Sequence, residues 1–377
     1  MDFSLFLTPF IPDSYTQGQL GQRVIFNAGS TDEIERNAIC IVHVKEYRNH
    51  VSPDDRTVGF RDELYPLYVH GYWKLQYYDL GDILPGEKID DTYFALQTLI
   101  AELVKKNCIP VVIGGSMDLM YALTIGYEAT EQLINLCAVD ERVNLGKPED
   151  PIQSNSYLSR LLVRRPCFLF NHATLGVQPN VNPPEELELC EKLYFDTVKL
   201  GTLSNDYRIA EPHLRNADII GMNLDALKSS ERLGAVGNPN GFTIEQFCRI
   251  SKYAGISDKL NCFGVFNPSS FKSNDAAIIA HTVWYFFEGL EERKGDFPVG
   301  SKKDYLRFSV MMDHEMKELI FYKSHKTERW WMEVPYPPAE ATKFERHHLV
   351  PCDKLDYENA MRNELPDLWW RTYQKLG

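Results

Sequence analysis

Seven residues are candidates for chemistry because each is a charged or amide side chain at the end of a short apolar run or just after it. Carboxylate oxygens suit hard divalent cations, and carboxyl groups can also act as general acids or bases. A guanidinium cannot bind a metal, but it can pair bidentately with carboxylates. The candidates are Asp118, Asp140, Glu141, Arg142, Asn144, Asn223 and Asp225.

Buried strands that alternate with helices would position these side chains. Such alternation is typical of β-α-β units and predicts a mainly parallel sheet with helices on both faces, a three-layer α-β-α architecture. Ligands of such sheets gather at the carboxyl ends of the strands. The predicted strands are Ala38–Val44, Leu75–Asp79, Ile109–Ile113, Leu133–Val139, Phe168–Phe170, Ile219–Met222 and Cys262–Phe266, and the predicted helices are Thr92–Lys106, Asp118–Ala129, Thr243–Ala254 and Asn274–Glu291.

The composition shifts near residue 300, so we expect an α/β domain over residues 1–300 and a C-terminal extension over residues 301–377 that packs on it. Strands are expected at Tyr305–Val310, Glu318–Tyr322 and Arg329–Val334, and one or two helices after Leu355. The tryptophan pairs of this extension are interpreted as packing against the core, with an exposed patch for a protein partner as the alternative. They are Trp330–Trp331 and Trp369–Trp370.

Charge and composition exclude some classes of partner. The net charge is −13, which argues against binding to nucleic acid or anionic membranes. The eight cysteines form no C-x-x-C pair and are expected to be buried, reduced thiols. We find no signal peptide and no membrane span, and the protein is expected in the cytoplasm.

Four degenerate motifs follow the predicted strands in an order and spacing that resemble the ureohydrolase superfamily of arginase, agmatinase and formiminoglutamase. That family has G-G-D-H-S, D-A-H-A-D, S-x-D-x-D and E-x-N-P at these places. The resemblance covers roughly residues 35–295 and implies an arginase-like fold. The corresponding segments are Gly114–Asp118, Asp140–Asn144, Gly221–Asp225 and Val265–Pro268.

The resemblance also implies that most metal ligands are absent. The family binds two manganese ions with six side chains, and the bridging hydroxide attacks a guanidino or formimino carbon. Only Asp140 and Asp225 keep the ligand type, so they are the candidate ligands if any metal binds. We expect no cofactor, or manganese if the site proves active. The six positions are Met117, Asp140, Arg142, Asn144, Asn223 and Asp225.

Two further expectations concern single side chains. Arg142 arrives at a ligand position between two surviving carboxylates, so we hypothesise that its guanidinium replaces the metals by bridging Asp140 and Asp225. His281 lies on an apolar helical segment and is expected to be a core residue. Ser116 to Asp118 is equally typical of a plain helix start.

The leading functional hypothesis is a catalytically inactive ureohydrolase-fold protein, a pseudoenzyme with a scaffolding, regulatory or binding role. It would act through an unknown protein partner, and the resemblance makes a homo-oligomer a fair expectation. One alternative is an active hydrolase of amidine C–N bonds with an altered metal site. Another is a small-molecule sensor that uses the old pocket.

Overall fold

The computed structural model describes residues 2–50, 59–233, 237–269, 274–298, 302–312, 318–337 and 344–376. The strands are β1 (Leu7–Thr8), β2 (Val24–Phe26), β3 (Ile39–Val44), β4 (Tyr77–Ile83), β5 (Ile109–Ile113), β6 (Ile134–Val139), β7 (Leu169–Val177), β8 (Asp196–Lys199), β9 (Ile219–Asn223), β10 (Cys262–Phe266), β11 (Tyr305–Val310), β12 (Leu319–Ser324), β13 (Trp330–Glu333) and β14 (Leu349–Cys352). The α-helices are α1 (Phe60–Leu64), α2 (Ile89–Lys105), α3 (Leu119–Gly126), α4 (Leu158–Val163), α5 (Pro184–Lys192), α6 (Leu200–Asn205), α7 (Ala210–Asn216), α8 (Ile244–Ile256), α9 (Asp275–Glu291), α11 (Lys354–Met361) and α12 (Asp367–Leu376).

The central sheet has ten strands in the order β1-β4-β3-β5-β10-β9-β6-β7-β8, with β2 paired to β4. All its pairings are parallel except that of β1 with β4. Because the strands run the same way, the carboxyl ends of β5, β6, β9 and β10 lie together at one edge of the sheet. This arrangement confirms the predicted mainly parallel sheet.

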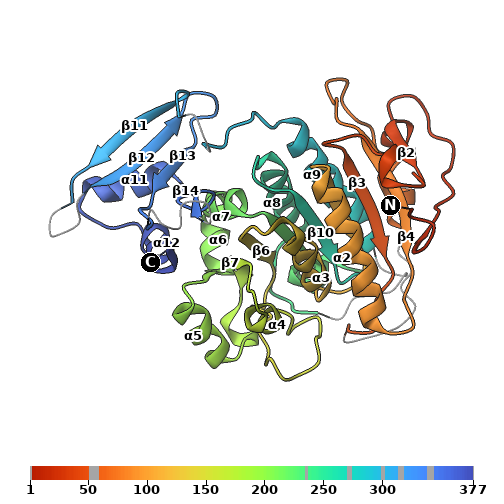
Figure 1. Ribbon diagram of the computed structural model, residues 1–377, viewed down its shortest axis with the longest axis horizontal. Coiled ribbons are helices and arrows are strands. Elements are labelled where there is room, and N and C mark those ends of the chain that lie inside the picture. The colour runs from red at the N-terminus through yellow and green to blue at the C-terminus, as the bar shows by residue number, and fades with distance from the viewer. Residues whose placement is uncertain are drawn as a thin grey trace.

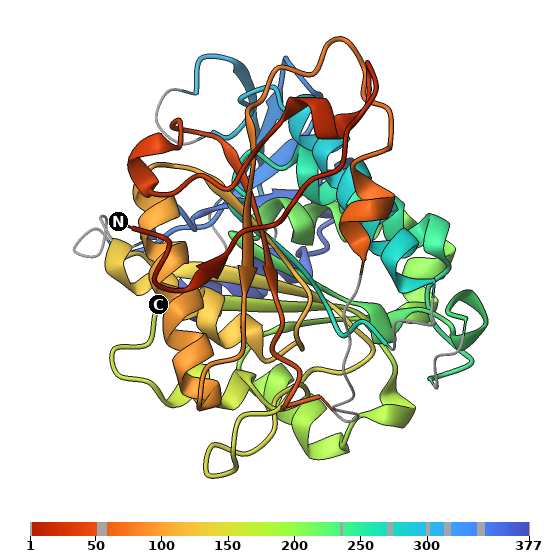
Figure 2. The ribbon, with the colours of Figure 1, turned by 90° about the vertical axis from the view of Figure 1, so that its right-hand side faces the viewer.

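Helices cover both faces of this sheet, as Figure 2 shows with α2 in orange on one side and α9 in cyan on the other. Alternate residues of each strand enter two separate cores. On β3, for example, Ile39 and Ile41 join the core beneath α8 and α9, whereas Cys40 and Val42 join the core beneath α2 and α3. The three-layer α-β-α fold is therefore confirmed.

The C-terminal extension forms a second, antiparallel sheet in the order β11-β12-β13-β14, with α11 and α12 beside it (Figure 1). It has its own core, which includes Trp330 and Trp369. Trp331 is fully buried against the guanidinium of Arg215 from α7, as the packing interpretation predicts, whereas Trp330 and Trp369 belong to the extension's own core. Trp370 is 43% exposed. The predicted boundary at residues 300 and 301 lies outside the described residues.

Several local expectations need correction. β7 continues to Val177, beyond the predicted end at Phe170, because neighbouring strands bury its polar middle, including His172. The sequence analysis did not predict β14, and His281 is exposed on the outer face of α9 rather than in the core. All eight cysteines are free thiols, and seven are buried as predicted, whereas Cys167 is only partly buried. Within the described ranges, no helix is long and apolar enough to cross a membrane.

Candidate functional site

The candidate site lies at the carboxyl edge of the central sheet, and a tight glycine turn opens it. Gly114 and Gly115 follow β5 with φ angles of 85° and 68°, which glycine adopts without strain. A Cβ on Gly114 would lie 2.6 Å from the ring of His43, so no larger residue fits there. The turn directs Met117 inward, where its backbone N–H donates to Oδ1 of Asn267 at 3.0 Å.

Asp140, which follows β6, is the centre of a closed hydrogen-bond network. Its Oδ2 accepts from Nδ2 of Asn144 and from Nδ2 of Asn223, both at 2.7 Å. Its Oδ1 accepts the backbone N–H of Arg142 at 3.1 Å. The Oδ1 of Asn223 accepts the backbone N–H of Asp225 at 2.8 Å, so the Asn223 amide must direct its N–H groups toward Asp140.

Burial dominates the electrostatics of Asp140. The side chain is fully buried, and burial raises the pKa of its carboxyl to about 7, although the amide donors favour the ionised form. Amide donors stabilise a carboxylate less than a metal dication or an ion pair would. The network therefore satisfies the carboxyl with neutral partners and without a counter-charge in contact.

Arg142 does not bridge the two aspartates, so that hypothesis is wrong. Its Nη1 donates to the carbonyl oxygen of Val181 at 2.6 Å, and its Nε lies 3.7 Å from Oε1 of Glu141. The side chain is 43% exposed. Contact with solvent and a carbonyl oxygen avoids the desolvation free energy that burial of the guanidinium between two carboxylates would cost.

Arg232 is a cation at the site that the sequence analysis did not identify. Its Nη1 donates to Asp225 at 2.8 Å, its Nε and Nη2 bind Asp275 at 3.0 and 2.7 Å, and Nη2 also reaches the carbonyl oxygen of Asn267 at 3.0 Å. Arg232 is 4% exposed, so a buried guanidinium joins the loop after β9 to the start of α9.

Asp225 has two further polar neighbours. Nδ2 of Asn267 donates to its Oδ2 at 2.9 Å, and Nε2 of His50 lies 3.7 Å from the same oxygen. Although burial opposes ionisation, His50 and Arg232 hold the pKa of Asp225 at about 2. Nothing in the spacing of His50 or Arg232 pointed to this site; Asn267 lies within the fourth motif and gave the one usable signal.

Two candidate acids lie outside the Asp140 network. Asp118 is buried beside α2, where it accepts from Ser116, from the Tyr93 hydroxyl and from Asn49, and burial raises the pKa of its carboxyl. Glu141 accepts from Nδ2 of Asn238 at 2.9 Å, and burial raises its pKa as well. The structure thus brings together Asp140, Asn144, Asn223 and Asp225, places Glu141 and Arg142 at their margin, and separates Asp118 from them.

The residues present do not fit a pair of manganese ions. Two hard dications need several anionic oxygen ligands with free lone pairs, whereas Asn144 and Asn223 present N–H groups toward Asp140. Met117 is buried at the position of a family histidine. Among the residues that the structure describes, no group of three or more His, Cys, Asp or Glu side chains could hold a metal ion.

Comparison with known proteins links this geometry to a known fold. No family model matches the chain. A formimidoylglutamase from Geobacillus sp. (strain WCH70) is 24% identical over 179 residues, which are 45% of this chain and 54% of that protein, so the chain spans about half of that relative's length.

Solved structures give a broader likeness. Formimidoylglutamase from Bacillus subtilis superposes with a TM-score of 0.64 at 14% identity over 73% of this chain and 92% of that one. A Trypanosoma cruzi formiminoglutamase with Mn²⁺ gives 0.63 at 16% identity over 70% and 97%. The agmatine ureohydrolase of Thermoplasma volcanium gives 0.56 at 15% identity over 74% and 95%.

The chain therefore has the fold of the ureohydrolases, as the four motifs predicted. The structures that share this fold include formimidoylglutamases and an agmatine ureohydrolase.

Proposed function

We propose that this protein is a catalytically inactive ureohydrolase-fold protein that acts by binding or scaffolding. One observation carries the proposal: Asn144 and Asn223, at positions where the resemblance expects metal-binding carboxylates, donate hydrogen bonds to Asp140 at 2.7 Å. A metal ion at this place would face the positive ends of the N–H dipoles, which repel a cation.

The surroundings of Asp225 support the same proposal. Arg232 is buried and is bound to both Asp225 and Asp275, so a permanent positive charge occupies the neighbourhood of the second surviving ligand position. Repulsion between a guanidinium and two dications at short range opposes metal binding. The proposed role therefore depends on protein surfaces, with homo-oligomers or an unknown protein partner as the expected form of association.

The experiment compares metal binding by the natural chain with that of a reconstructed variant. The variant carries Met117→His, Arg142→His, Asn144→Asp and Asn223→Asp, which restores the six family ligands. Both proteins are purified with manganese supplied, and metal content and melting temperature are measured after gel filtration. We expect manganese to leave the melting temperature of the natural chain unchanged and to raise that of the variant.

About two manganese ions per natural chain, by the family's stoichiometry, would overturn the proposal and favour the alternative, an active amidine hydrolase. If the variant fails to fold, the manganese content and melting curve of the natural chain decide the question alone. Thermal shift of the natural chain with arginine, agmatine and formiminoglutamate addresses the sensor alternative, which requires a shift without turnover.

A further inference from the structure

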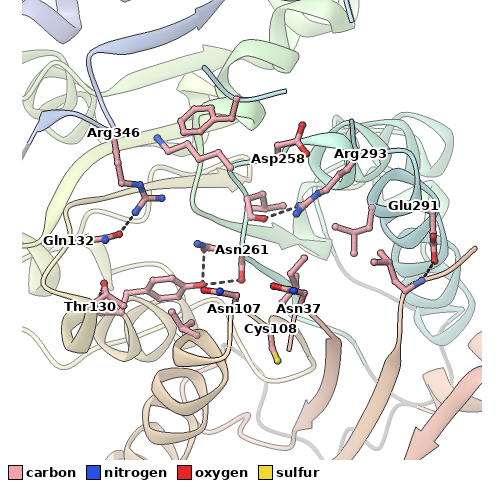
Figure 3. A pocket seen from close by; sticks show the side chains of 18 of the residues that line it. Asn37, Asn107, Cys108, Thr130, Gln132, Asp258, Asn261, Glu291, Arg293 and Arg346 are labelled. Atoms are coloured by element: carbon pink, nitrogen blue, oxygen red, sulfur yellow. Dashed lines mark hydrogen bonds between the residues drawn. The ribbon is translucent and has the colours of Figure 1, made fainter. Parts of the chain in front are cut away.

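A cavity lies at the opposite edge of the sheet from Asp140. Its volume is about 990 Å³, within the range of small-molecule sites. It is lined by residues at the amino-terminal ends of β5 and β10, by the end of α9, and by Arg346 of the C-terminal extension. Figure 3 shows Arg346 and Arg293 on two sides of this pocket, with Asn261 between them.

Four cationic side chains line the cavity, and its two lining carboxylates are bound elsewhere. The cations are Lys74, Lys259, Arg293 and Arg346. The carboxylate of Glu291 accepts the backbone N–H groups of residues 74 and 75 and the Tyr77 hydroxyl. The carboxylate of Asp258 accepts the backbone N–H groups of residues 295 and 296.

Two of the cations that line the cavity share one carboxylate, that of Asp218. Asp218 is almost fully buried, and it pairs with Arg346 at 2.9 Å and with Lys259 at 3.8 Å. One oxygen of Asp218 also accepts the backbone N–H of Asn135 at 2.8 Å. A single negative charge therefore serves two cations, and one of them, Lys259, is only 4% exposed.

Arg293 is half-buried, and the nearby charge of Asp258 offsets only part of its loss of hydration. Its guanidinium donates to the carbonyl oxygens of Gly255 at 2.9 Å and Leu260 at 2.8 Å, and in the described part of the chain it forms no ion pair. Burial lowers the pKa of Lys259 to about 8 and that of Arg293 to about 10. Buried cations whose neighbours do not offset the loss of hydration are stabilised by an added anion.

The rest of the wall is largely aromatic, aliphatic or neutral and polar. Tyr127, Tyr72 and Phe297 supply ring surface, and the Tyr127 hydroxyl holds Asn261 by hydrogen bonds to its carbonyl oxygen and Oδ1 at 3.0 and 2.8 Å. Such a wall suits the organic body of a ligand, while the cations suit its charged group.

We infer that this cavity binds a small organic molecule that carries a phosphate group. Two guanidinium forks and an ammonium group approach from different elements, which suits a tetrahedral dianion better than a planar monoanion. Arg346 comes from the extension, so the core alone would not complete the site. The inference concerns a different place in the fold from the Asp140 site and does not depend on the absence of catalysis there.

The test is calorimetric titration of the full chain at constant ionic strength with inorganic phosphate, AMP, adenosine and succinate. Phosphate and AMP are expected to bind, AMP more tightly, and adenosine at least about tenfold more weakly than AMP because it lacks the charged group. Arg346→Gln should weaken AMP binding about tenfold. Lys74→Gln, at an exposed position whose side chain forms no hydrogen bond or ion pair with the described residues, should weaken it about threefold.

Arg307→Gln is the matched control, since Arg307 is an exposed arginine of the same extension that pairs with Glu318 away from the cavity, and it should not change AMP binding. Circular dichroism checks that each variant is folded. Absence of both phosphate and AMP binding would overturn the inference, and so would equal affinity of Lys74→Gln and Arg307→Gln for AMP. Succinate binding as tight as that of phosphate would overturn the choice of phosphate.

Discussion

At the scale of single residues, Asn223 decides the character of the site because its amide joins Asp140 to the backbone of Asp225. Asn223→Asp would put a second carboxylate 2.7 Å from a buried one. We expect a loss of about 2 kcal/mol or more in the free energy of unfolding at neutral pH, because like charges repel and a donor is lost. Chemical denaturation measures this loss.

Asn180→Asp provides a control for that change, since Asn180 is exposed. Its free energy of unfolding should stay within about 0.5 kcal/mol of the natural value. Manganese should not restore the stability of Asn223→Asp, because Met117, Arg142 and Asn144 still lack the family's ligand groups. Full restoration by manganese would contradict this account of the site.

We expect the free energy of unfolding to fall in acid because of His172. It is buried in β7, and burial lowers the pKa of its ring to about 4, below the ordinary value of 6.5. The neutral ring is favoured in the folded state, so its contribution is complete above about pH 6.5 and is lost as the pH falls through 4. The loss amounts to about 3 kcal/mol.

Denaturation of His172→Gln and of the natural chain from pH 7 to pH 4 measures this contribution. The two free energies should converge or cross as the pH falls, because the variant has no ring to protonate. His281→Gln, at an exposed position, should follow the natural chain throughout. Parallel profiles for His172→Gln and the natural chain would mean that the ring does not titrate differently on folding.

The residue scale also marks the limit of sequence-based prediction of the site. Asp140, Asn144, Asn223 and Asp225 were predictable because each lies at or just after the end of a strand whose apolar pattern is clear. Arg232 was not, because it reaches the site from a loop whose path depends on tertiary packing.

At the scale of elements, Arg232 joins the loop after β9 to the start of α9 through Asp225 and Asp275. Arg232→Met would remove one buried guanidinium that pairs with both Asp225 and Asp275, and the Asp275 side chain is 1% exposed. We expect the free energy of unfolding to fall by about 3 kcal/mol or more, because removal of one member of a buried ion pair is costly. Urea denaturation followed by circular dichroism gives the value.

The control is Arg249→Met on α8, where an exposed arginine pairs with Glu245 one helical turn away. That change should cost no more than about 0.5 kcal/mol. Similar losses in the two variants would show that the Arg232 contacts add nothing beyond a surface pair.

Element boundaries were predictable where the local pattern decides them. β5, β10 and β11 match their predicted limits, and α8 begins at its predicted amino-terminal end, where Thr243 forms a capping box with Gln246. β14 was not predictable because Pro351 is unfavourable in most strands. It is tolerated here since β14 is the edge strand of its sheet.

At the scale of the whole molecule, Arg215 holds the extension to the core. Its guanidinium donates to the carbonyl oxygens of Trp330 at 3.0 Å and Cys352 at 2.9 Å and lies over the ring of Trp331. Arg215→Ala should cost about 3 kcal/mol and should speed amide exchange in β13 and β14. Hydrogen-exchange mass spectrometry resolves these segments.

Arg208→Ala serves as the comparison, because Arg208 is an exposed arginine paired with Asp206. Exchange in β13 and β14 should remain at its natural rate in that variant. If Arg215→Ala also leaves those rates unchanged, other contacts suffice to hold the extension, for example that of Arg346 with Asp218.

The pairing of Asp218 with Arg346 has a consequence for biosynthesis. The two residues are 128 positions apart, so the ribosome delivers the carboxylate long before its closer cationic partner. In the interval, Leu133 and Phe170 also lack the residues of the extension's core against which they pack in the folded protein. A nascent chain halted before Arg346 should expose apolar surface beside a buried, under-compensated charge, and should be the form that chaperones bind.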